Sequence, residues 1–181
     1  MGMINFLQVI INILYYFLWS LVLSSILYFT VFYIYPDLIP ESLLKTTKIN
    51  FSFNNVTDSI GPILAYVNLS LLLYGFSLLK RIIPFFKRGE FYTFQVLNDL
   101  RIVGFIFVFI GLSIMLIKMV LGLLHYESIE GKENYRNIFS VIIRSFDVPM
   151  ISIIISGLFF LVFSDSFKKV KKIKEENDLT I

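Results

Sequence analysis

The sequence predicts an all-α integral membrane protein with four transmembrane helices and both termini in the cytoplasm. It is strongly apolar, with 57% hydrophobic and 16% charged residues, and a soluble domain is rarely so apolar. Long apolar stretches alternate with short polar segments. Most lysines and arginines lie in every second polar segment, which a four-span chain places on one side of the membrane. Each stretch supplies the ~20 mostly apolar residues that a bilayer-spanning helix needs. The stretches are residues 6–35, 62–83, 102–124 and 149–167.

No loop between these stretches is long enough for a separate water-soluble domain, so residues 1–181 are predicted to form one transmembrane domain. Residues 168–181 form its basic and acidic cytoplasmic tail. The first apolar run is too long for a signal-peptide core and has no small-residue cleavage site. We therefore expect it to stay in the protein as an anchor.

The orientation follows from the lysines and arginines, because loops rich in them stay on the cytoplasmic side. The loop between the second and third spans carries Lys80, Arg81, Lys87, Arg88 and Arg101. The tail adds Lys168, Lys169, Lys171, Lys172 and Lys174. The two loops on the other side carry fewer cations, so both termini are predicted to be cytoplasmic. Topology explains the net charge of +3, and we expect no direct binding of nucleic acid.

The second span has readable ends. Pro62 suits a first helical turn, since its missing amide proton would be unpaired there anyway, and Ser59 or Gly61 can cap that turn. Pro84 is expected to end the helix.

The third and fourth spans are expected to extend beyond the bilayer. Thr93 is suited to cap a helix that runs directly into the third span and is ~48 Å long, more than a ~30 Å hydrocarbon core. Its first two turns, with Asn98, Asp99 and Arg101, should then project into the cytoplasm. The lysine-rich end of the fourth span should meet the negative end of its helix dipole.

The short outer loops carry two patterns. Apolar residues recur at steps of three and four over residues 135–146, which predicts an amphipathic interfacial helix. This helix either binds or senses something at the outer face, or packs on the other helices. Apolar and polar residues alternate over 49–54, which predicts a strand. Because a lone strand leaves its edges unpaired, we expect a β-hairpin there.

The few polar residues inside the spans have structural explanations beside functional ones. Lys118 can neutralise a substrate, pair with Asp147, or extend its four-carbon stem to the outer headgroups, and we expect the last. Asn68 and Ser77 are expected to hydrogen-bond between helices or back to a carbonyl. Asp165 is expected to form an ion pair with Lys168 or Lys169. Glycines such as Gly104, Gly111 and Gly157 are expected to allow close helix packing.

No catalytic or metal-binding set can be assembled from the sequence. There is no cysteine, which excludes disulfides, thiolate metal sites and cysteine nucleophiles. The single histidine, His125, lies near Glu127 without a second ligand at metal-binding spacing. A membrane enzyme would have to use these two residues and Asp147, so it is the least favoured of the candidate functions. The sequence therefore predicts a protein that is not an enzyme and that needs no cofactor or metal.

Two cytoplasmic segments carry a family resemblance. One is Gly-Glu-Phe at 89–91, followed by Leu-Arg-Ile-Val-Gly at 100–104, and the other is Lys-Glu-Glu-Asn-Asp-Leu-Thr-Ile at 174–181. Together they resemble the bacterial membrane family catalogued as domain of unknown function 2975, which has the same four-span layout over most of the chain. The resemblance implies a bacterial plasma membrane protein with no assigned activity. Members are often encoded beside a short helix-turn-helix regulator, which implies a cytoplasmic transcription factor as partner.

The tail can also be interpreted from its charges. The lysines of residues 168–174 attract anionic lipid at roughly 1 kcal/mol per residue. The acidic residues 175–178 would be repelled from the same surface and would present residues 179–181 as an extended end for docking. The alternative is an unstructured terminus whose lysines only fix the orientation.

These observations favour a non-enzymatic membrane regulator or adaptor that binds a cytoplasmic helix-turn-helix transcription factor. The alternative is a small transporter, channel subunit or immunity-type membrane protein, with Lys118 and Asp147 as its intramembrane polar residues. The bilayer is a partner in either case, and the sequence leaves a homo-oligomer open. The residues expected to bind the regulator are Lys87, Arg88, Gly89, Phe91, Arg101, Glu175, Glu176, Asp178, Leu179, Thr180 and Ile181.

Overall fold

The computed structural model describes residues 2–34, 56–130 and 147–178. These residues form four long helices: α1 (Met3–Ile34), α3 (Val56–Lys87), α4 (Phe94–Glu130) and α6 (Val148–Asp178). Each contains a segment long and apolar enough to cross a membrane, namely Met3–Leu27, Ile63–Lys87, Phe94–Val120 and Val148–Asn177. The predicted all-helical fold with four membrane-spanning helices is therefore confirmed.

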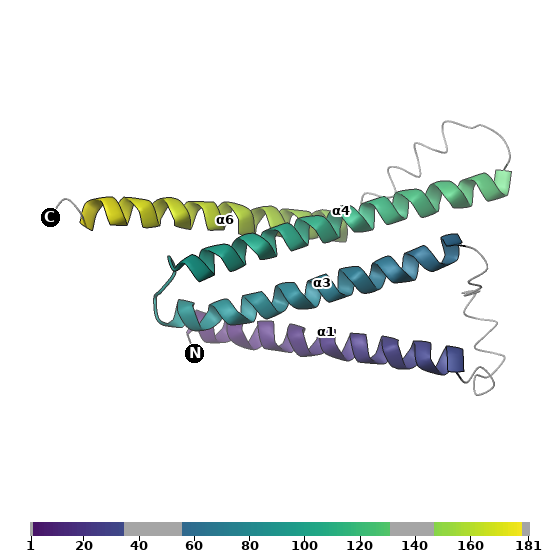
Figure 1. Cartoon of the computed structure of the whole chain (residues 1–181), viewed down its shortest axis with the longest axis horizontal. Helices are drawn as coiled ribbons and strands as arrows, with labels where there is room; N and C mark the ends of the chain where they lie inside the picture. Colours follow the sequence, from purple (N-terminus) through teal and green to yellow (C-terminus); the bar gives the residue numbers. More distant parts are fainter. Residues whose placement is uncertain (1, 35–55, 131–146, 179–181) are drawn as a thin grey trace.

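The helices lie side by side in the order α1, α3, α4, α6 (Figure 1). Within the described ranges each helix contacts only its neighbours in this row, and α4 and α6 share the most extensive contact. The arrangement is therefore an open row, in which α1 packs on α3 alone. Apolar side chains on α1 such as Phe6 and Leu23 are exposed by 61% and 60%. Such surfaces are compatible with lipid, whose tails are as apolar as leucine.

The core of the row is centred on α4. Its residues Val103, Ile106, Phe107 and Ile110 are buried together with Leu78 of α3. On the other side of α4, the Phe107 ring stacks on the Phe160 ring of α6, with centroids 5.8 Å apart. α4 thus packs on α3 on one side and on α6 on the other, and its contact with α6 is the most extensive among the described helices.

Close packing of α4 on α6 depends on glycines. A Cβ atom added at Gly157 of α6 would lie 2.7 Å from both the Gly104 carbonyl oxygen and the Val108 amide nitrogen of α4. At Gly104 an added Cβ would lie 2.9 Å from the Gly157 carbonyl oxygen, and at Gly111 it would collide with Ile154. The expected packing role of these three glycines is confirmed.

The predicted ends of the second span were wrong. α3 begins at Val56, so Pro62 does not lie in its first turn, and the helix continues past Pro84 to Lys87. A proline removes one backbone hydrogen bond and strains the turn before it. Transmembrane helices tolerate prolines because neighbouring contacts and local adjustments satisfy the backbone groups that are set free. The apolar turns around both prolines therefore stay helical.

The continuous third helix is confirmed. The Thr93 hydroxyl oxygen accepts a hydrogen bond from the Val96 amide at 3.4 Å, and its carbonyl accepts one from the Leu97 amide at 3.1 Å, so Thr93 caps α4 as predicted. The helix has 37 residues. Its length of ~55 Å exceeds the hydrocarbon core by more than the sequence predicts.

α6 extends through most of the predicted tail and ends at Asp178. Its last turn holds acidic residues and no basic ones, so the predicted pairing of lysines with the helix dipole was wrong. The acidic residues 175–178 are part of this helix. Lys171 pairs with Glu175, and Lys172 with Glu176, each with a nitrogen to oxygen distance of 3.7 Å. Such pairs one turn apart support a helix by ~0.2–0.5 kcal/mol each.

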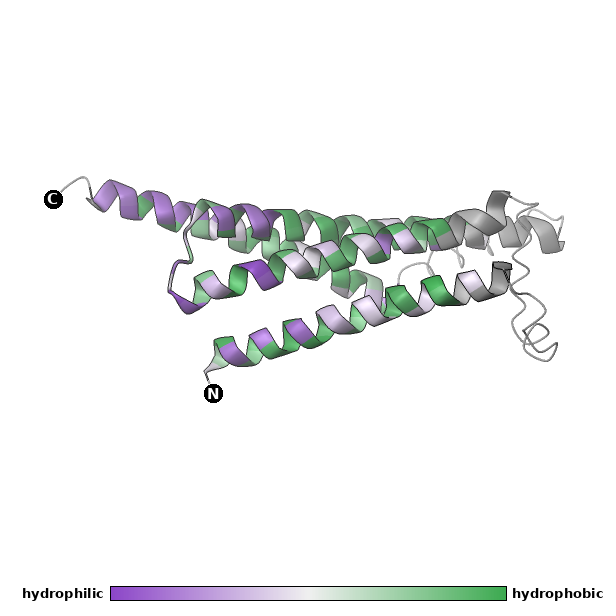
Figure 2. Ribbon diagram, turned by 60° about the horizontal axis from the view of Figure 1, so that its bottom comes forward, coloured by the Kyte–Doolittle hydropathy of each residue, from purple (hydrophilic) through white to green (hydrophobic). Residues whose placement is uncertain are grey.

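Both described termini and the α3–α4 turn lie at the same end of the row (Figure 1). The last turns of α6 are hydrophilic, whereas its middle is hydrophobic (Figure 2). We call this the polar end; it comprises residues 81–101 and 164–178. The predicted hairpin near 49–54 and the amphipathic helix over 135–146 lie outside the described residues. The cytoplasmic location of the polar end stays a prediction.

Candidate functional site

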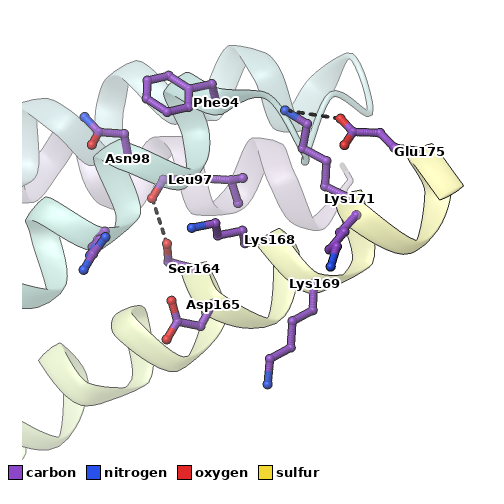
Figure 3. A pocket seen from close by; sticks show the side chains of 11 residues that line it. Phe94, Leu97, Asn98, Ser164, Asp165, Lys168, Lys169, Lys171 and Glu175 are labelled. Atoms are coloured by element: carbon purple, nitrogen blue, oxygen red, sulfur yellow. Dashed lines mark hydrogen bonds and ion pairs between the residues drawn. The ribbon is translucent and has the colours of Figure 1, made fainter.

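A cleft with a volume of about 430 Å³ lies at the polar end, between the first turns of α4 and the last third of α6 (Figure 3). The α4 side consists of Phe94, Leu97, Asn98 and Arg101. These positions follow the spacing i, i+3, i+4, i+7 and so share one helical face. The α6 side consists of Ser164, Asp165, Lys168, Lys169, Lys171, Lys172 and Glu175. Two helices that are far apart in the sequence thus bring cationic side chains to one place.

The cleft is electropositive. One arginine and four lysines line it, against two carboxylates, Asp165 and Glu175. Glu175 is paired with Lys171. Among the described residues Asp165 forms no ion pair, so its predicted pairing with Lys168 or Lys169 is not found. Lys168 extends between the two helices and Lys169 points away from α4, so neither side chain turns back to the carboxylate (Figure 3).

A buried hydrogen bond joins the two walls of the cleft. The hydroxyl of Ser164, which is only 4% exposed, donates to the Leu97 carbonyl oxygen at 2.8 Å. Since Leu97 is in the first turn of α4, this bond fixes that turn against α6. The cleft therefore has a fixed floor between the lysine-rich wall of α6 and the wall of α4 that carries Arg101.

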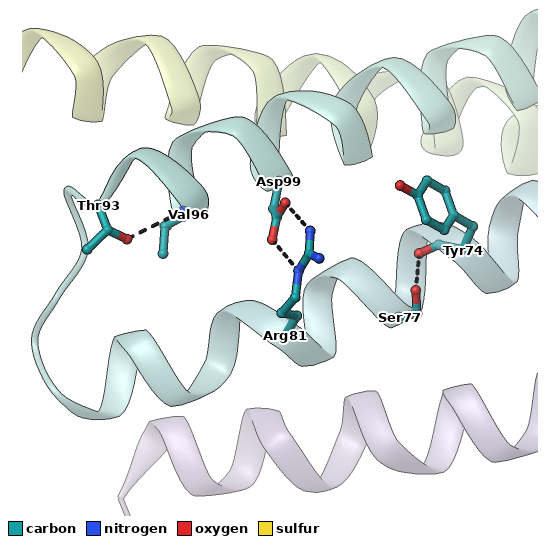
Figure 4. A network of polar contacts seen from close by, with 6 residues as sticks. All are labelled: Tyr74, Ser77, Arg81, Thr93, Val96 and Asp99. Atoms are coloured by element: carbon teal, nitrogen blue, oxygen red, sulfur yellow. Dashed lines mark hydrogen bonds and ion pairs between the residues drawn. The ribbon is translucent and has the colours of Figure 1, made fainter.

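A second polar contact fixes α4 on its opposite face, against α3 (Figure 4). The Arg81 guanidinium donates to both oxygens of Asp99, from Nε at 2.8 Å and from Nη2 at 2.5 Å. The Asp99 side chain is 2% exposed and that of Arg81 is 52% exposed. Charge-assisted bidentate pairs of this kind are among the stronger side-chain contacts.

Asp99 is thus buried against α3, whereas Asn98 and Arg101 are exposed. That these turns project into the cytoplasm stays a prediction. The sequence contained a signal for this pair. Val96 and Val103 lie three and four residues from Asp99, so its face of α4 is apolar. A carboxylate on such a face needs a cation, and Arg81 precedes it at the same end of the neighbouring helix.

The α3–α4 turn explains two residues that were expected to bind a partner. Gly89 has a φ of 74°, and its amide donates to the Phe86 carbonyl at 3.2 Å, while the Glu90 amide donates to the Phe85 carbonyl at 2.9 Å. These two bonds and a left-handed glycine form a Schellman cap. The Phe91 ring then packs on the Phe86 ring, with centroids 5.3 Å apart. Gly89 and Phe91 thus have roles in shaping the turn.

The other predicted partner residues divide into three groups. Lys87 and Arg88 are exposed on the turn, Arg101 and Glu175 line the cleft, and Glu176 and Asp178 lie in the last turn of α6. The Tyr92 ring packs edge-on against the Phe167 ring of α6, with centroids 5.7 Å apart, so the turn and the end of α6 are in contact. Residues 179–181 lie outside the described residues.

The two intramembrane polar candidates meet at the opposite end. Lys118 of α4 donates to Asp147, which directly precedes α6. Of the alternatives for Lys118, the ion pair with Asp147 is therefore the one present. The other Asp147 oxygen accepts a hydrogen bond from the Met150 amide at 3.2 Å and caps α6. The Lys118 ammonium, aided by this amide, holds the pKa of the Asp147 carboxyl below its usual range.

Polar side chains in the middle of the row make the contacts expected for packing. The Asn68 amide donates to the Ser113 hydroxyl across α3 and α4 at 3.1 Å, and the Ser77 hydroxyl donates back to the Tyr74 carbonyl at 2.8 Å. In the part of the chain that the structure describes, no group of three histidine, aspartate or glutamate side chains could hold a metal ion.

Comparison of the chain with protein-family models, curated proteins and solved structures finds no match. The resemblance to domain of unknown function 2975 therefore stays a prediction. The length and composition of the four helices place the chain among multi-pass helical membrane proteins.

Proposed function

We propose that this protein is a non-enzymatic regulator or adaptor of the bacterial plasma membrane that binds a cytoplasmic helix-turn-helix transcription factor. The observation that supports this proposal is the construction of the polar end. The Arg81–Asp99 pair fixes α4 to α3, and the Ser164–Leu97 hydrogen bond fixes α4 to α6. Three helices therefore present a firm polar surface with exposed charges, as a docking platform needs.

The end of α6 offers a second feature suited to a protein partner. Val170 and Ile173, three residues apart, are 43% and 57% exposed among lysines and glutamates. An exposed apolar ridge on a charged helix is the feature that a hydrophobic groove in a partner recognises. The lysines and glutamates around it would fix how the partner aligns along α6 and would make binding sensitive to salt concentration. Partner binding would then change how much transcription factor is available for DNA.

Crosslinking in the membrane followed by mass spectrometry tests this proposal. The tagged full chain is compared with a variant that ends at Lys174 and with a double charge reversal, Lys87→Glu with Arg88→Glu. We expect a helix-turn-helix protein with the full chain, none with the truncated variant, and less with the charge reversal. Lys118→Leu, at the opposite end, is the matched control and should recover the partner normally. If the full chain recovers no soluble partner, the proposal fails.

The second candidate is a small transporter, channel subunit or immunity-type membrane protein. The observation that favours it is the Lys118–Asp147 ion pair, since Lys118 lies within a candidate span and charged residues there commonly mark solute or ion pathways. The same variants separate the two functions. A transporter would lose solute flux into liposomes with Lys118→Leu and would retain it when the chain ends at Lys174.

A further inference from the structure

We propose that the cleft between α4 and α6 binds the headgroup of an anionic phospholipid of the adjoining leaflet, with a preference for a hydroxyl-bearing headgroup such as that of phosphatidylglycerol. The inference goes beyond the proposed function and does not depend on it. It rests on the charge of the cleft, on the apolar surface beside it, and on the Asp165 carboxylate.

The charge of the cleft matches a phosphodiester. Arg101 lines the cleft from α4 and Lys168 lines it from α6, so a phosphate between the helices would meet cations on both sides. A guanidinium can bind two phosphate oxygens at once, and an ammonium adds a compact positive charge. With Glu175 paired to Lys171, cations outnumber the remaining carboxylate. An anion is therefore the ligand that this cleft would attract.

The surroundings of the cleft indicate a lipid as the source of that anion. Arg101 and Asp165 stand where the polar end meets the apolar spans, and the Arg101 guanidinium lies 5.7 Å from the centroid of the Phe105 ring. Phe105 lies one turn beyond Arg101 on α4 and is 54% exposed. Leu158 lies two turns before Asp165 on α6 and is 49% exposed. By helical periodicity, these side chains continue the two helix faces that line the cleft. A headgroup in the cleft would thus have its acyl chains on an apolar surface.

Asp165 provides selectivity among anionic lipids. Its carboxylate is exposed and lines the cleft beside the cations. A carboxylate repels phosphate, but it accepts hydrogen bonds from the hydroxyls of a glycerol headgroup. Asn98, on the facing wall, can donate or accept as well. A lipid whose phosphate lies between Arg101 and Lys168, and whose headgroup hydroxyls face Asp165, would bind both the cations and the carboxylate of the cleft.

Native mass spectrometry of the purified full chain in detergent tests this inference. The lipids are phosphatidylglycerol, phosphatidic acid and phosphatidylcholine with identical acyl chains, and inorganic phosphate is the soluble competitor. We expect bound phosphatidylglycerol in excess of the other two lipids. The double substitution Arg101→Gln with Lys168→Gln should weaken this binding roughly 10- to 30-fold, from the loss of two cations near the membrane surface.

The matched control is Lys87→Gln with Lys174→Gln, which removes the same charge from the polar end but outside the cleft and should retain the lipid. Equal losses in both double variants would overturn the inference in favour of general attraction. Displacement of the lipid by an equal concentration of inorganic phosphate would overturn the lipid as ligand. Retained helical circular dichroism shows that each variant is folded.

Asp165→Ala separates headgroup recognition from simple attraction. The substitution makes the cleft more positive, so attraction alone predicts tighter binding of every anionic lipid. Recognition of the headgroup hydroxyls instead predicts a loss of the preference for phosphatidylglycerol over phosphatidic acid. A retained preference would overturn the role of Asp165. Because no protein partner is present in these measurements, failure of the lipid inference leaves the docking proposal to its own test.

Discussion

Replacing Arg81 by methionine is expected to lower the free energy of unfolding by about 2 kcal/mol, because the Asp99 carboxylate would remain buried without its cation. Breaking a fully buried ion pair costs ~3–5 kcal/mol. The half-exposed guanidinium of Arg81 is partly solvated, which lowers the expected cost. Unfolding in mixed micelles with increasing SDS, followed by circular dichroism, measures the change.

The control for this prediction is Arg88→Met. Arg88 pairs with Glu90 at 3.1 Å, but both side chains are well exposed, so its loss should cost less than about 0.5 kcal/mol. The double substitution Arg81→Met with Asp99→Leu removes both charges and should recover most of the lost stability. Equal costs for Arg81→Met and Arg88→Met would mean that the buried pair does not fix α3 to α4.

Replacing Gly157 by leucine is expected to cost about 3 kcal/mol, at the upper end of the range for overpacked cores. The added Cβ would lie 2.7 Å from backbone atoms of α4, which cannot move aside as a side chain can. α4 and α6 would have to separate, and the cleft between them would change shape. The same SDS titration measures the effect, and lipid binding should weaken in parallel.

Gly75→Ala is the control for this prediction. A Cβ at Gly75 would lie 3.6 Å from Ile106 Cγ2, an ordinary contact distance. Alanine also favours a helix over glycine by up to ~1 kcal/mol, so this variant should be as stable as the wild type or more so. If Gly157→Leu behaved like Gly75→Ala, the close contact of α4 with α6 would be wrong.

The sequence predicts the four helices well because a run of ~20 apolar residues has few other stable structures. It predicts their ends less well, for two physical reasons. Pro62 and Pro84 resemble helix ends in water but are tolerated within membrane helices. Residues 168–178 look like a tail by charge, yet lysine and glutamate are strong helix formers and so continue α6.

The candidate site could be predicted only in part. The positive charge of Arg101 and of the α6 lysines is evident from the sequence, and so is their common side of the membrane. The cleft itself depends on which helices are neighbours, and that depends on three-dimensional contacts such as Gly104 with Gly157. The Arg81–Asp99 pair could have been found, since an acidic residue on an apolar helical face needs a partner.

Cysteine labelling in intact cells most directly tests the claim that the polar end is cytoplasmic, on which the docking proposal depends. The chain has no cysteine of its own, so single cysteines can be introduced without background. With a membrane-impermeant maleimide, we expect Asn54→Cys to be labelled in intact cells. Glu90→Cys and Lys174→Cys should be labelled only after permeabilisation. Labelling of the latter two in intact cells would contradict the account.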